Sequence, residues 1–331
     1  MISQFSNKKG PETLNQIFIT FDVEDFINPV STEALEIILK MLKKHDLRAI
    51  FFITGYMAET IKKYPEMIEM LRTHEIGYHS SSHSVRPAIF EYTDVEDYVE
   101  AYETSIQRET SHINPLTGEI EGKGGIKLLQ ELFSNKRISA YRAPGCGWSP
   151  PHLEALRDLG IEFDFSSNIS PTPMLYRGIT FYPHPVLGDW SGGKLEYLIV
   201  LRSVFTKKFT IIDVHPNSLV CLNMWDSNYY NGNPQRLHES KSRNPHHIVS
   251  LFNSFELLMK QLHLLQKLKL VEITPALNKA QDNLYVNEND FERIYQISVL
   301  WAKRYFNYNP RFLRSHFLRF FNLPDIQHEG S

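Results

Sequence analysis

The sequence predicts an α/β fold built on a parallel sheet, and two features of the chain carry this prediction. Short apolar runs rich in β-branched residues alternate with stretches whose apolar residues recur at helical spacing. Strands that alternate with helices in this way connect as parallel neighbours through crossover helices. In addition, clusters of polar residues follow several of the apolar runs directly, at the positions where an α/β barrel places its catalytic groups.

The first half of the chain contains the clearest elements. The run 16–25 reads as a buried strand that ends in acids, and the run 47–53 is a second strand that ends before Gly55. Apolar residues at helical spacing predict a helix over 32–45 between them, which completes a β-α-β unit. The same reasoning gives a helix over 65–74, a strand over 75–78 and a helix over 94–111.

The second half continues the alternation less regularly. We predict strands over 138–142, 161–165, 179–182, 197–201, 210–214 and 271–274, and a helix over 247–268. Residues 224–245 are rich in Asn, Ser, Tyr and Gly, and we expect them to form a long loop over the site. We therefore divide the chain into an N-terminal tail (1–14), a barrel domain (15–277) and a C-terminal helical extension (278–331).

The composition limits the classes of partner and the compartment. The chain has 331 residues, and 35 Lys and Arg against 38 Asp and Glu give a net charge of -3, so no global basic field favours a nucleic-acid partner. Only Cys146 and Cys221 are present, which excludes a disulfide framework and a zinc site made of cysteines. A polar N-terminus and the absence of a long apolar run predict a cytoplasmic protein.

Two acids lie at the end of the first predicted strand. Because side chains alternate along a strand, Asp22 and Glu24 point to one side of it and Val23 points to the other. One carboxylate could then bind a metal ion while the other accepts a proton from water. A solvated strand end with an acidic turn is the competing interpretation of this motif.

A pair of histidines follows the strand predicted over 75–78. If the chain enters a helical turn there, His79 and His83 lie on one face and can hold one cation. Such a pair also arises by chance in a chain with 14 histidines, so the acids at the end of the first strand carry the interpretation. Two histidines and one carboxylate, with a coordination position left open, form a familiar catalytic metal set.

Two further clusters follow later strands. Arg142 leaves a strand into a turn of Pro and Gly, where it can brace a carboxylate, and Gly145 allows backbone N–H groups to approach an oxyanion. An ordinary tight turn with a surface arginine is the alternative. His215 ends an apolar strand two residues after Asp213, and it could act as a general acid toward a leaving amine instead of serving only a structural role.

Taken in order, these segments resemble the polysaccharide deacetylase family, also called carbohydrate esterase family 4 or the NodB homology domain. The segments that carry the resemblance are 20–25 (TFDVED), 74–83 (HEIGYHSSSH), 142–145 (RAPG) and 214–216 (VHP), and the run 47–55 resembles the second strand of the family. The resemblance spans about residues 15–277, and the histidine motif is its most specific part. It implies a distorted (β/α)7 barrel of the glycoside hydrolase and deacetylase type that hydrolyses the N-acetyl amide of a sugar.

The resemblance also implies catalytic roles. Asp22 would be the general base, and Arg142 would orient it. The Gly145 N–H would help to bind the oxyanion, and His215 would protonate the departing amine. The aromatic residue that usually follows Arg-x-Pro in the family is replaced by Gly145 here. The acid that supports His215 is left open among Asp164, Asp189 and Asp213.

The implied metal site departs from the family pattern at one position. His79 and His83 would bind one divalent ion, with zinc preferred and cobalt, manganese or nickel as alternatives. The usual first motif is Thr-Phe-Asp-Asp-Gly, and the position of its second, metal-binding Asp is occupied by Val23. We choose Glu24 as the third ligand, because strand alternation places it on the side of Asp22, and we keep Asp25 as the fallback.

The resulting prediction is a metal-dependent enzyme that releases acetate from an N-acetylated amino sugar of a cell-surface polysaccharide or its precursor. A metal-free hydrolase of a small cyclic amide is one alternative on the same fold, and an inactive sugar-binding domain, suggested by Val23, is another. We predict that the extension is a helical layer packed on the barrel, since aromatic stripes are more often core. The alternative is a peripheral contact of its basic and aromatic residues with the inner face of the membrane.

Overall fold

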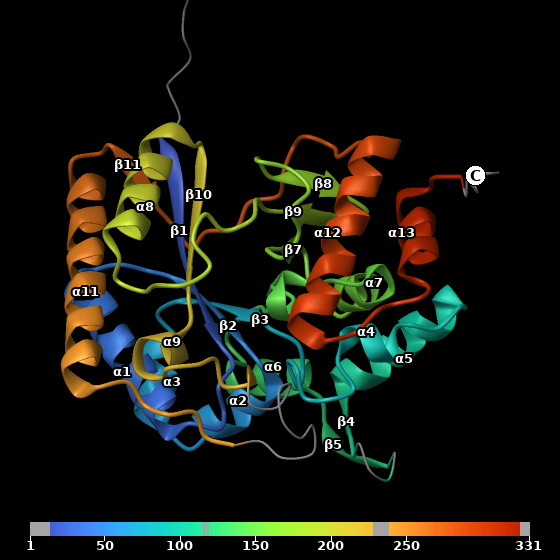
Figure 1. The fold of residues 1–331 in the computed structure, drawn as a ribbon, viewed down its shortest axis with the longest axis horizontal. Helices are drawn as coiled ribbons and strands as arrows, with labels where there is room; N and C mark the ends of the chain where they lie inside the picture. The colour runs from blue at the N-terminus through green and yellow to red at the C-terminus, as the bar shows by residue number, and fades with distance from the viewer. Residues whose placement is uncertain (1–13, 115–116, 118, 228–237, 325–331) are drawn as a thin grey trace, which may run out of the picture.

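The main architectural feature of the chain is one curled, mostly parallel sheet with helices packed around it (Figure 1). The computed structural model describes residues 14–114, 117, 119–227 and 238–324. The predicted N-terminal tail, residues 1–14, lies outside the described residues except for Leu14. The curled sheet and its helices confirm the predicted fold class, an α/β barrel of distorted form with a helical C-terminal extension.

The sheet has nine strands, and its order along the hydrogen-bonded path is β10-β1-β2-β3-β6-β7-β9-β8, with β11 paired to β1 beside this path. Every pair in it is parallel except β8 with β9. Its strands are β1 (Asn15–Val23), β2 (Ile50–Ile53), β3 (Glu75–Tyr78), β6 (Ala140–Tyr141), β7 (Phe163–Asp164), β8 (Met174–Tyr176), β9 (Ile179–Phe181), β10 (Phe209–Val214) and β11 (Val271–Ile273). A separate antiparallel hairpin consists of β4 (Ser111–Ile113) and β5 (Ile120–Lys123).

The central strand β1 presents polar side chains toward the inside of the curl at its C-terminal half. Its register sets Thr20 opposite Asp213 of β10 and Asp22 opposite Phe52 of β2. After β9 the chain returns to the side of β10, where Val186 N donates to Ile211 O and Asp213 N donates to Leu187 O, each at 2.9 Å. Side chains from β1, β10 and this returning segment therefore meet at one end of the barrel.

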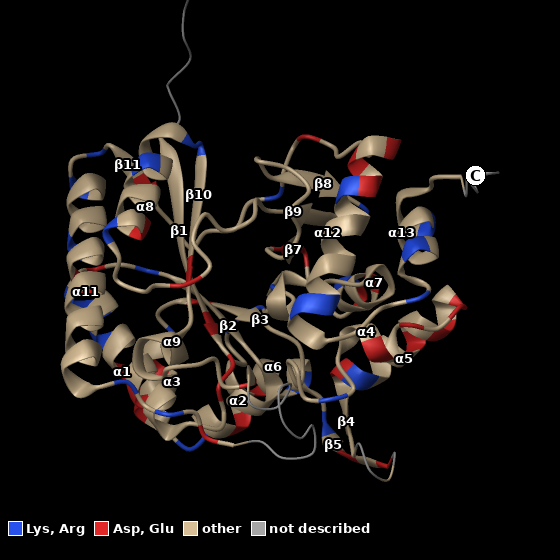
Figure 2. Ribbon diagram, viewed as in Figure 1, with Lys and Arg blue, Asp and Glu red and all other residues tan. Residues whose placement is uncertain are grey.

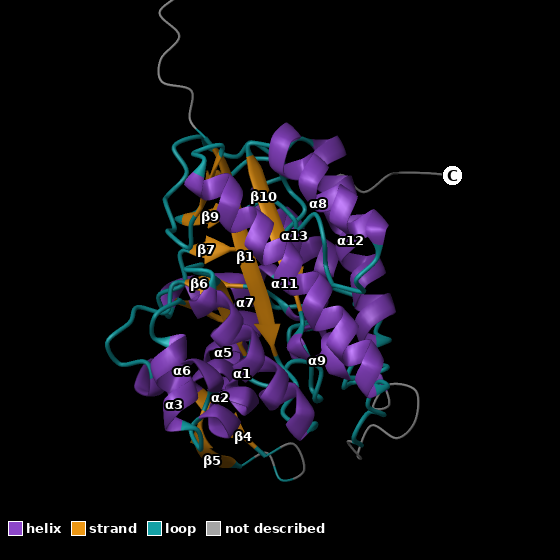
Figure 3. Ribbon diagram, turned by 90° about the vertical axis from the view of Figure 1, so that its left-hand side faces the viewer, coloured by secondary structure: helices purple, strands orange, loops and turns teal. Residues whose placement is uncertain are grey.

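Helices surround the sheet, as the side view in Figure 3 shows. The helix α1, for example, begins at a proline, a residue favoured in the first turn of a helix. The helices are α1 (Pro29–Lys44), α2 (Gly55–Ile61), α3 (Pro65–Leu71), α4 (Ile89–Tyr92), α5 (Tyr98–Thr110), α6 (Gly125–Leu132), α7 (Pro150–Asp158), α8 (Lys194–Thr206), α9 (Pro216–Val220), α11 (Pro245–Lys267), α12 (Glu288–Phe306) and α13 (Leu313–Phe321), with a short 3-10 turn over Pro144–Cys146. None of the described helices is long and apolar enough to cross a membrane.

The hydrophobic core has two parts, one on each face of the curled sheet. The larger part joins the outer face of the strands to the helices and includes residues from β1 through α13. The smaller part lies inside the curl, where the rings of Phe165 and Tyr182 stack with centroids 4.5 Å apart and Phe18 meets Tyr182 at 5.3 Å. This aromatic plug fills the barrel beneath the polar end of β1, so the cavity of the site has a rigid floor.

The C-terminal helices α12 and α13 pack on the barrel. The Phe317 ring lies 4.8 Å from the ring of Trp148, and the Phe320 ring lies 5.7 Å from it, measured between centroids. Figure 2 shows basic residues on both helices and several acidic residues on α5. These contacts confirm the predicted helical layer. Five aromatic residues of the described part of the extension are buried and are not available to a membrane surface: Phe291, Phe306, Phe317, Phe320 and Phe321.

One predicted element is wrong, and several observed helices, α2 among them, were not predicted. The run 197–201, predicted as a strand, lies inside the helix α8, because a short apolar run has the same pattern in both structures and its length decides between them. The helix α2 was not predicted, although its N-terminus carries a standard signal: the Thr54 hydroxyl accepts a hydrogen bond from Met57 N at 3.1 Å.

Candidate active site

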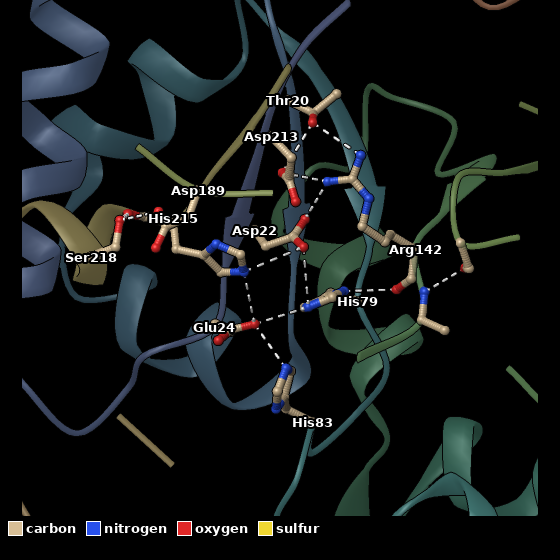
Figure 4. A network of polar contacts seen from close by, with 12 residues as sticks. Thr20, Asp22, Glu24, His79, His83, Arg142, Asp189, Asp213, His215 and Ser218 are labelled. Carbon is tan, nitrogen blue, oxygen red and sulfur yellow. Dashed lines mark hydrogen bonds and ion pairs between the residues drawn. The ribbon is translucent and has the colours of Figure 1, made fainter. Parts of the chain in front are cut away.

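Three of the predicted site residues, Glu24, His79 and His83, converge on one point. Glu24 follows β1, and both histidines follow β3. Glu24 Oε2 lies 3.0 Å from His79 Nε2 and 2.8 Å from His83 Nε2, and all three side chains are buried (Figure 4). One donor atom from each residue lies within 4.8 Å of the other two. Two imidazoles and one carboxylate at this spacing can hold a divalent cation.

The two imidazoles do not meet on a helical turn, and this part of the prediction is wrong. The segment after β3 is a loop in which Ser80 and His83 adopt left-handed conformations, with φ of 64° and 53°. The Ser80 hydroxyl accepts a hydrogen bond from His83 N at 3.1 Å, which closes the turn. Uncommon left-handed residues that are not glycine are held in place by their surroundings, and here they aim both rings at Glu24.

Neighbouring groups orient the donor atoms. His79 Nδ1 lies 2.7 Å from Arg142 O, and a carbonyl can only accept, so Nδ1 carries the proton and the lone pair of Nε2 faces Glu24. Trp225 Nε1 donates to Glu24 Oε1 at 2.9 Å, which leaves Oε2 toward the histidines. His83 Nδ1 faces Asp226 Oδ2 at 3.7 Å. Trp225 and Asp226 were missed, because their segment was predicted only as a loop over the site.

Asp22 lies beside this donor set and is fixed by Arg142. The guanidinium is buried; one of its nitrogens lies 2.8 Å from Asp22 Oδ1 and 2.5 Å from Asp213 Oδ1, and the other donates to the Thr20 hydroxyl at 3.0 Å. Asp22 Oδ2 remains directed toward His79, with 3.7 Å to Nε2. One oxygen of Asp22 is thus occupied by the arginine, and the other faces the cavity.

The charges around Asp22 keep it ionised. Burial raises the pKa of the Asp22 carboxyl, but the Arg142 guanidinium and the imidazoles of His79 and His215 outweigh this effect, so its pKa is below the ordinary value. Burial likewise raises the pKa of Glu24, and the nearby His83 and His215 bring it well below the usual range. The site therefore presents two carboxylates that hold their negative charge despite burial.

His215 reaches the same cluster from the end of β10. Its Nε2 lies 3.7 Å from Asp22 Oδ2 and 4.0 Å from Glu24 Oε2. Burial lowers the pKa of His215, but the surrounding carboxylates, Glu24 first, raise it to about 9. An imidazole with this pKa is protonated at neutral pH and can donate a proton.

The remaining acids take different positions. Asp25, the fallback metal ligand, points away from the histidines, and its Oδ2 accepts a hydrogen bond from Asn217 Nδ2 at 2.6 Å. Asp164 accepts hydrogen bonds from Ser166 Oγ at 2.6 Å and from Ser167 N at 3.1 Å. Only Asp189 and Asp213 of the three acids considered for His215 lie in the cavity with it. Asp189 accepts a hydrogen bond from the Ser218 hydroxyl, which also lies within hydrogen-bonding distance of His215 O.

The N-terminal half of the chain, which contains most of the site residues, matches a known protein family. The model of the polysaccharide deacetylase family matches residues 9–163, a range that contains Asp22, Glu24, His79, His83 and Arg142. Through these residues, this part of the chain is similar to the polysaccharide deacetylase family. The family resemblance inferred from the motifs is thereby confirmed, whereas the role of each residue is taken up below as a proposal.

The individual proteins to which the chain is similar are distant from it. An uncharacterized 30.6 kDa protein of Geobacillus stearothermophilus, from the fumA 3' region, is 31% identical over 132 residues, which cover 39% of this chain and 43% of that protein. Among solved structures, a carbohydrate esterase family 4 pseudoenzyme from Bacillus anthracis is 14% identical, covers 80% of this chain and 64% of its own, and has a TM-score of 0.39. The peptidoglycan deacetylase PdaC from Bacillus subtilis is 16% identical, covers 78% and 87%, and has a TM-score of 0.38. The chain thus covers less than two thirds of the length of the relatives matched first.

The site opens into a cavity of about 280 Å³. Asp22, Glu24, His83, Gly145 and His215 line it, so the predicted Gly145 lies on the same cavity as the acids and histidines. Gly145 has φ +55°, a conformation that glycine adopts without strain. Another part of the lining comes from the helix α12 through Trp301, Tyr305 and Phe306, which no motif in the sequence identified.

Proposed function

We propose that the chain is a metal-dependent hydrolase that removes the N-acetyl group from an amino sugar of a cell-surface polysaccharide or its precursor and releases acetate. The family match supports the reaction class. The observation that carries the proposal is the position of Asp22, an ionised carboxylate fixed by Arg142 and placed 3.7 Å from a nitrogen of the cluster formed by Glu24, His79 and His83.

The donor set fits a divalent ion. Glu24 Oε2, His79 Nε2 and His83 Nε2 are directed to one point, and the hydrogen bonds to the far side of His79 and Glu24 leave these three atoms as the free donors. A mixed nitrogen and oxygen set of three suits zinc and related transition metals. Such an ion would polarise the acetyl carbonyl and make water more acidic.

Asp22 is the proposed general base. Its free oxygen faces the cavity, where it can accept the proton of a water molecule that attacks the carbonyl carbon of the acetamide. Arg142 holds the other oxygen at 2.8 Å and keeps the carboxylate from rotating. Because Arg142 is also bonded to Thr20, the base is positioned by β1 and by the turn after β6 together.

His215 is the proposed general acid. Its Nε2 faces the same space as Asp22 Oδ2, and its raised pKa of about 9 keeps it protonated at neutral pH. When the tetrahedral intermediate collapses, this proton would pass to the departing amine nitrogen, which leaves as the free amino sugar. The N–H of Gly145, on the wall of the cavity, would donate to the oxyanion.

Acetate release tests this proposal. Purified protein should release acetate from oligomers of an N-acetylated hexosamine, and Asp22→Asn should lower the rate by about 100-fold or more, since general bases contribute this much. Asp282→Asn, a change of an exposed acid away from the cavity, is the matched control and should leave the rate unchanged. If the wild-type protein releases no acetate from any N-acetylhexosamine oligomer, the inactive sugar-binding domain would replace the deacetylase proposal.

The metal part of the proposal has a separate readout. Metal analysis of the purified protein should find one divalent ion per chain, and Glu24→Gln or His83→Ala should lower this content. Chelation should abolish acetate release, and added zinc should restore it. Full acetate release by the chelated protein would overturn the assignment of Glu24, His79 and His83 as ligands of a catalytic metal.

A further inference from the structure

Part of the wall of the cavity is aromatic. Trp301 and Tyr305 are four residues apart on α12, so their side chains lie on one face of the helix, and both line the cavity together with Asp22 and His215. Tyr305 is 41% exposed, which is unusual for a large ring beside a buried site. Exposed aromatic faces in a cavity are typical contacts for a ligand.

Tyr305 is seated against the turn that follows β6. A side-chain carbon added at Gly145 would lie 2.9 to 3.0 Å from the atoms of the Tyr305 ring, closer than real side chains approach. The glycine thus allows the ring to lie directly on the backbone of the turn. Tyr305 therefore stands next to the proposed oxyanion donor and within the same cavity as the proposed base.

Trp301 is supported from behind by His184. The two rings stack with centroids 5.3 Å apart and an interplanar angle of 23°. Burial, together with the charge of Arg142, lowers the pKa of His184 to about 4, so the imidazole is neutral at physiological pH. The indole therefore rests on an uncharged planar support and also lines the cavity.

The helix that carries these rings is firmly attached to the barrel. The Arg293 guanidinium donates to Asn168 O at 2.5 Å and to Ile169 O at 2.8 Å. At the other end, Asp94 accepts hydrogen bonds from Tyr308 Oη at 2.7 Å and from Arg311 N at 2.7 Å. These anchors give the aromatic wall a fixed position relative to the acids, as a binding surface requires.

The charge of the cavity limits the ligand class. No Lys or Arg side chain in the described part of the chain lines the cavity. Five carboxylates line it: Asp22, Glu24, Asp189, Asp213 and Asp226. A phosphate group in this cavity would meet these five carboxylates, which outnumber the positive charges that His215 and the proposed divalent ion contribute. An uncharged sugar ring avoids this repulsion, and its C–H face can stack on an aromatic ring.

We propose that Trp301 and Tyr305 form a binding platform for the pyranose rings of an uncharged N-acetylhexosamine glycan, and that the C-terminal helix α12 thereby selects a glycan chain over a phosphate-linked sugar. This inference rests on the proposed deacetylase function and deepens it. The acetamide of one sugar points to Asp22 and the donor set, while the ring face lies on the platform.

Binding measurements test the platform. The probe is a β-1,4-linked tetramer of N-acetylglucosamine, titrated by calorimetry into zinc-loaded protein that carries Asp22→Asn, so that the ligand is not cleaved. Trp301→Ala and Tyr305→Ala should each raise Kd by about tenfold, the loss expected for an aromatic contact at the centre of a binding surface. Tyr305→Phe retains the ring and should keep Kd within about twofold of the Asp22→Asn protein.

Matched controls separate stacking from general damage. Leu300→Ala changes a neighbour on α12 that is 58% exposed and does not line the cavity, and Tyr285→Ala removes a ring that is 85% exposed elsewhere. Both should bind the tetramer as the Asp22→Asn protein does. Equal Kd values for Trp301→Ala, Tyr305→Ala and these controls would overturn the platform, as would a lack of tetramer binding by the Asp22→Asn protein.

The ligand class is tested with a nucleotide-linked sugar. UDP-N-acetylglucosamine should bind the same protein more weakly than the tetramer does, and tighter binding of the nucleotide sugar would overturn the uncharged class. Failure of the platform and failure of the enzyme are distinguishable. Acetate release with unchanged binding in the Trp301 and Tyr305 variants rejects the platform alone. Weakened binding in those variants without acetate release by the wild type rejects the deacetylase alone.

Discussion

Arg142 has the most demanding position of any single residue in the chain. Its guanidinium is fully buried and lies between Asp22 and Asp213, two carboxylates that would repel each other without it. Burial raises the pKa of Asp213, Arg142 opposes this and Asp22 adds to it, and the resulting value is about 7. The arginine therefore supports both the fold and the position of the proposed base.

Removal of this arginine should impair the protein in two ways. Arg142→Met should lower the free energy of unfolding by about 3 kcal/mol, because it leaves buried carboxylates without a partner. It should also abolish acetate release, since Asp22 loses its orientation. Urea denaturation and the acetate assay measure the two effects. Arg157→Met, which removes a partly exposed arginine, is the control and should cost less than about 1 kcal/mol; equal losses would show that burial of Arg142 has no special weight.

Metal binding should stabilise the chain through the same residues that the site proposal uses. Added zinc should raise the melting temperature of chelated protein, because an ion that binds only the folded state shifts the unfolding equilibrium. His83→Ala should remove most of this rise, since it deletes one of three donors. His247→Ala alters an exposed histidine and should leave the rise intact. A zinc-induced shift that survives in His83→Ala would place the ion elsewhere.

At the scale of residues, the sequence predicted those parts of the site that lie on or just after regular strands. Strand alternation and the motifs indicated Asp22, Glu24 and Arg142, because a strand fixes the direction of each side chain. The sequence could not indicate that Trp225 and Trp301 lie at the site. These residues come from a loop and from a distant helix, and their approach to the site depends on tertiary packing that no local pattern encodes.

Among the elements, the strand β3 carries a buried histidine at its start as well as two at its end. His74 precedes β3; its Nδ1 accepts a hydrogen bond from Ala49 N at 3.3 Å, and its ring lies 5.1 Å from that of Phe51. Burial lowers the pKa of His74 to about 4, and the charges of Arg48 and Lys136 add to this effect. The folded state therefore holds this imidazole neutral.

His74 should make the protein less stable in mild acid. Its pKa is lower in the folded state than in the unfolded chain, so the unfolded chain binds more protons as the pH falls from about 6.5 toward 4. Stability is fully present above about pH 6.5, and about 2 kcal/mol of it should be lost at pH 5. His74→Asn should reduce the difference in unfolding free energy between pH 7 and pH 5 by this amount. His247→Asn should not, and an unchanged difference in His74→Asn would contradict the assignment.

Regular elements were predicted best where length and end signals agreed with the apolar pattern. The strand 75–78 was predicted with the observed bounds, and α1, α5 and α11 were found with shifted ends. The prediction of a strand over 197–201 was wrong, because these β-branched residues lie inside the longer helix α8. Near the N-terminus of this helix, the Glu196 carboxylate accepts a hydrogen bond from Ser191 N at 2.8 Å. Composition over five residues is too short a window to decide between the two structures.

At the scale of the molecule, the C-terminal helices share the core of the barrel. Phe306 and Phe317 belong to the same buried cluster as residues of β1 and α1. Trp148, which follows the Arg142 turn, is 1% exposed because Phe317 and Phe320 cover it. The helix α12 thus links the stability of the fold to the wall of the cavity.

A chain that ends at Asn278 should be unstable. Removal of α12 and α13 uncovers Trp148 and other apolar side chains of the barrel, so we expect a lower melting temperature and increased binding of a hydrophobic dye. Calorimetry and dye fluorescence measure these effects. A shorter deletion that removes only residues 325–331 is the control and should leave the melting temperature unchanged. An intact melting temperature in the chain that ends at Asn278 would mean that the barrel folds without the extension.

The pairing of β1 has a consequence for synthesis of the chain on the ribosome. β1 gains one neighbour, β2, within a few dozen residues, but its other partners, β10 and β11, begin at Phe209 and Val271. One edge of a strongly apolar strand therefore stays without hydrogen-bonding partners until most of the polypeptide has been translated. During that interval this edge is open to pairing with strands of other chains.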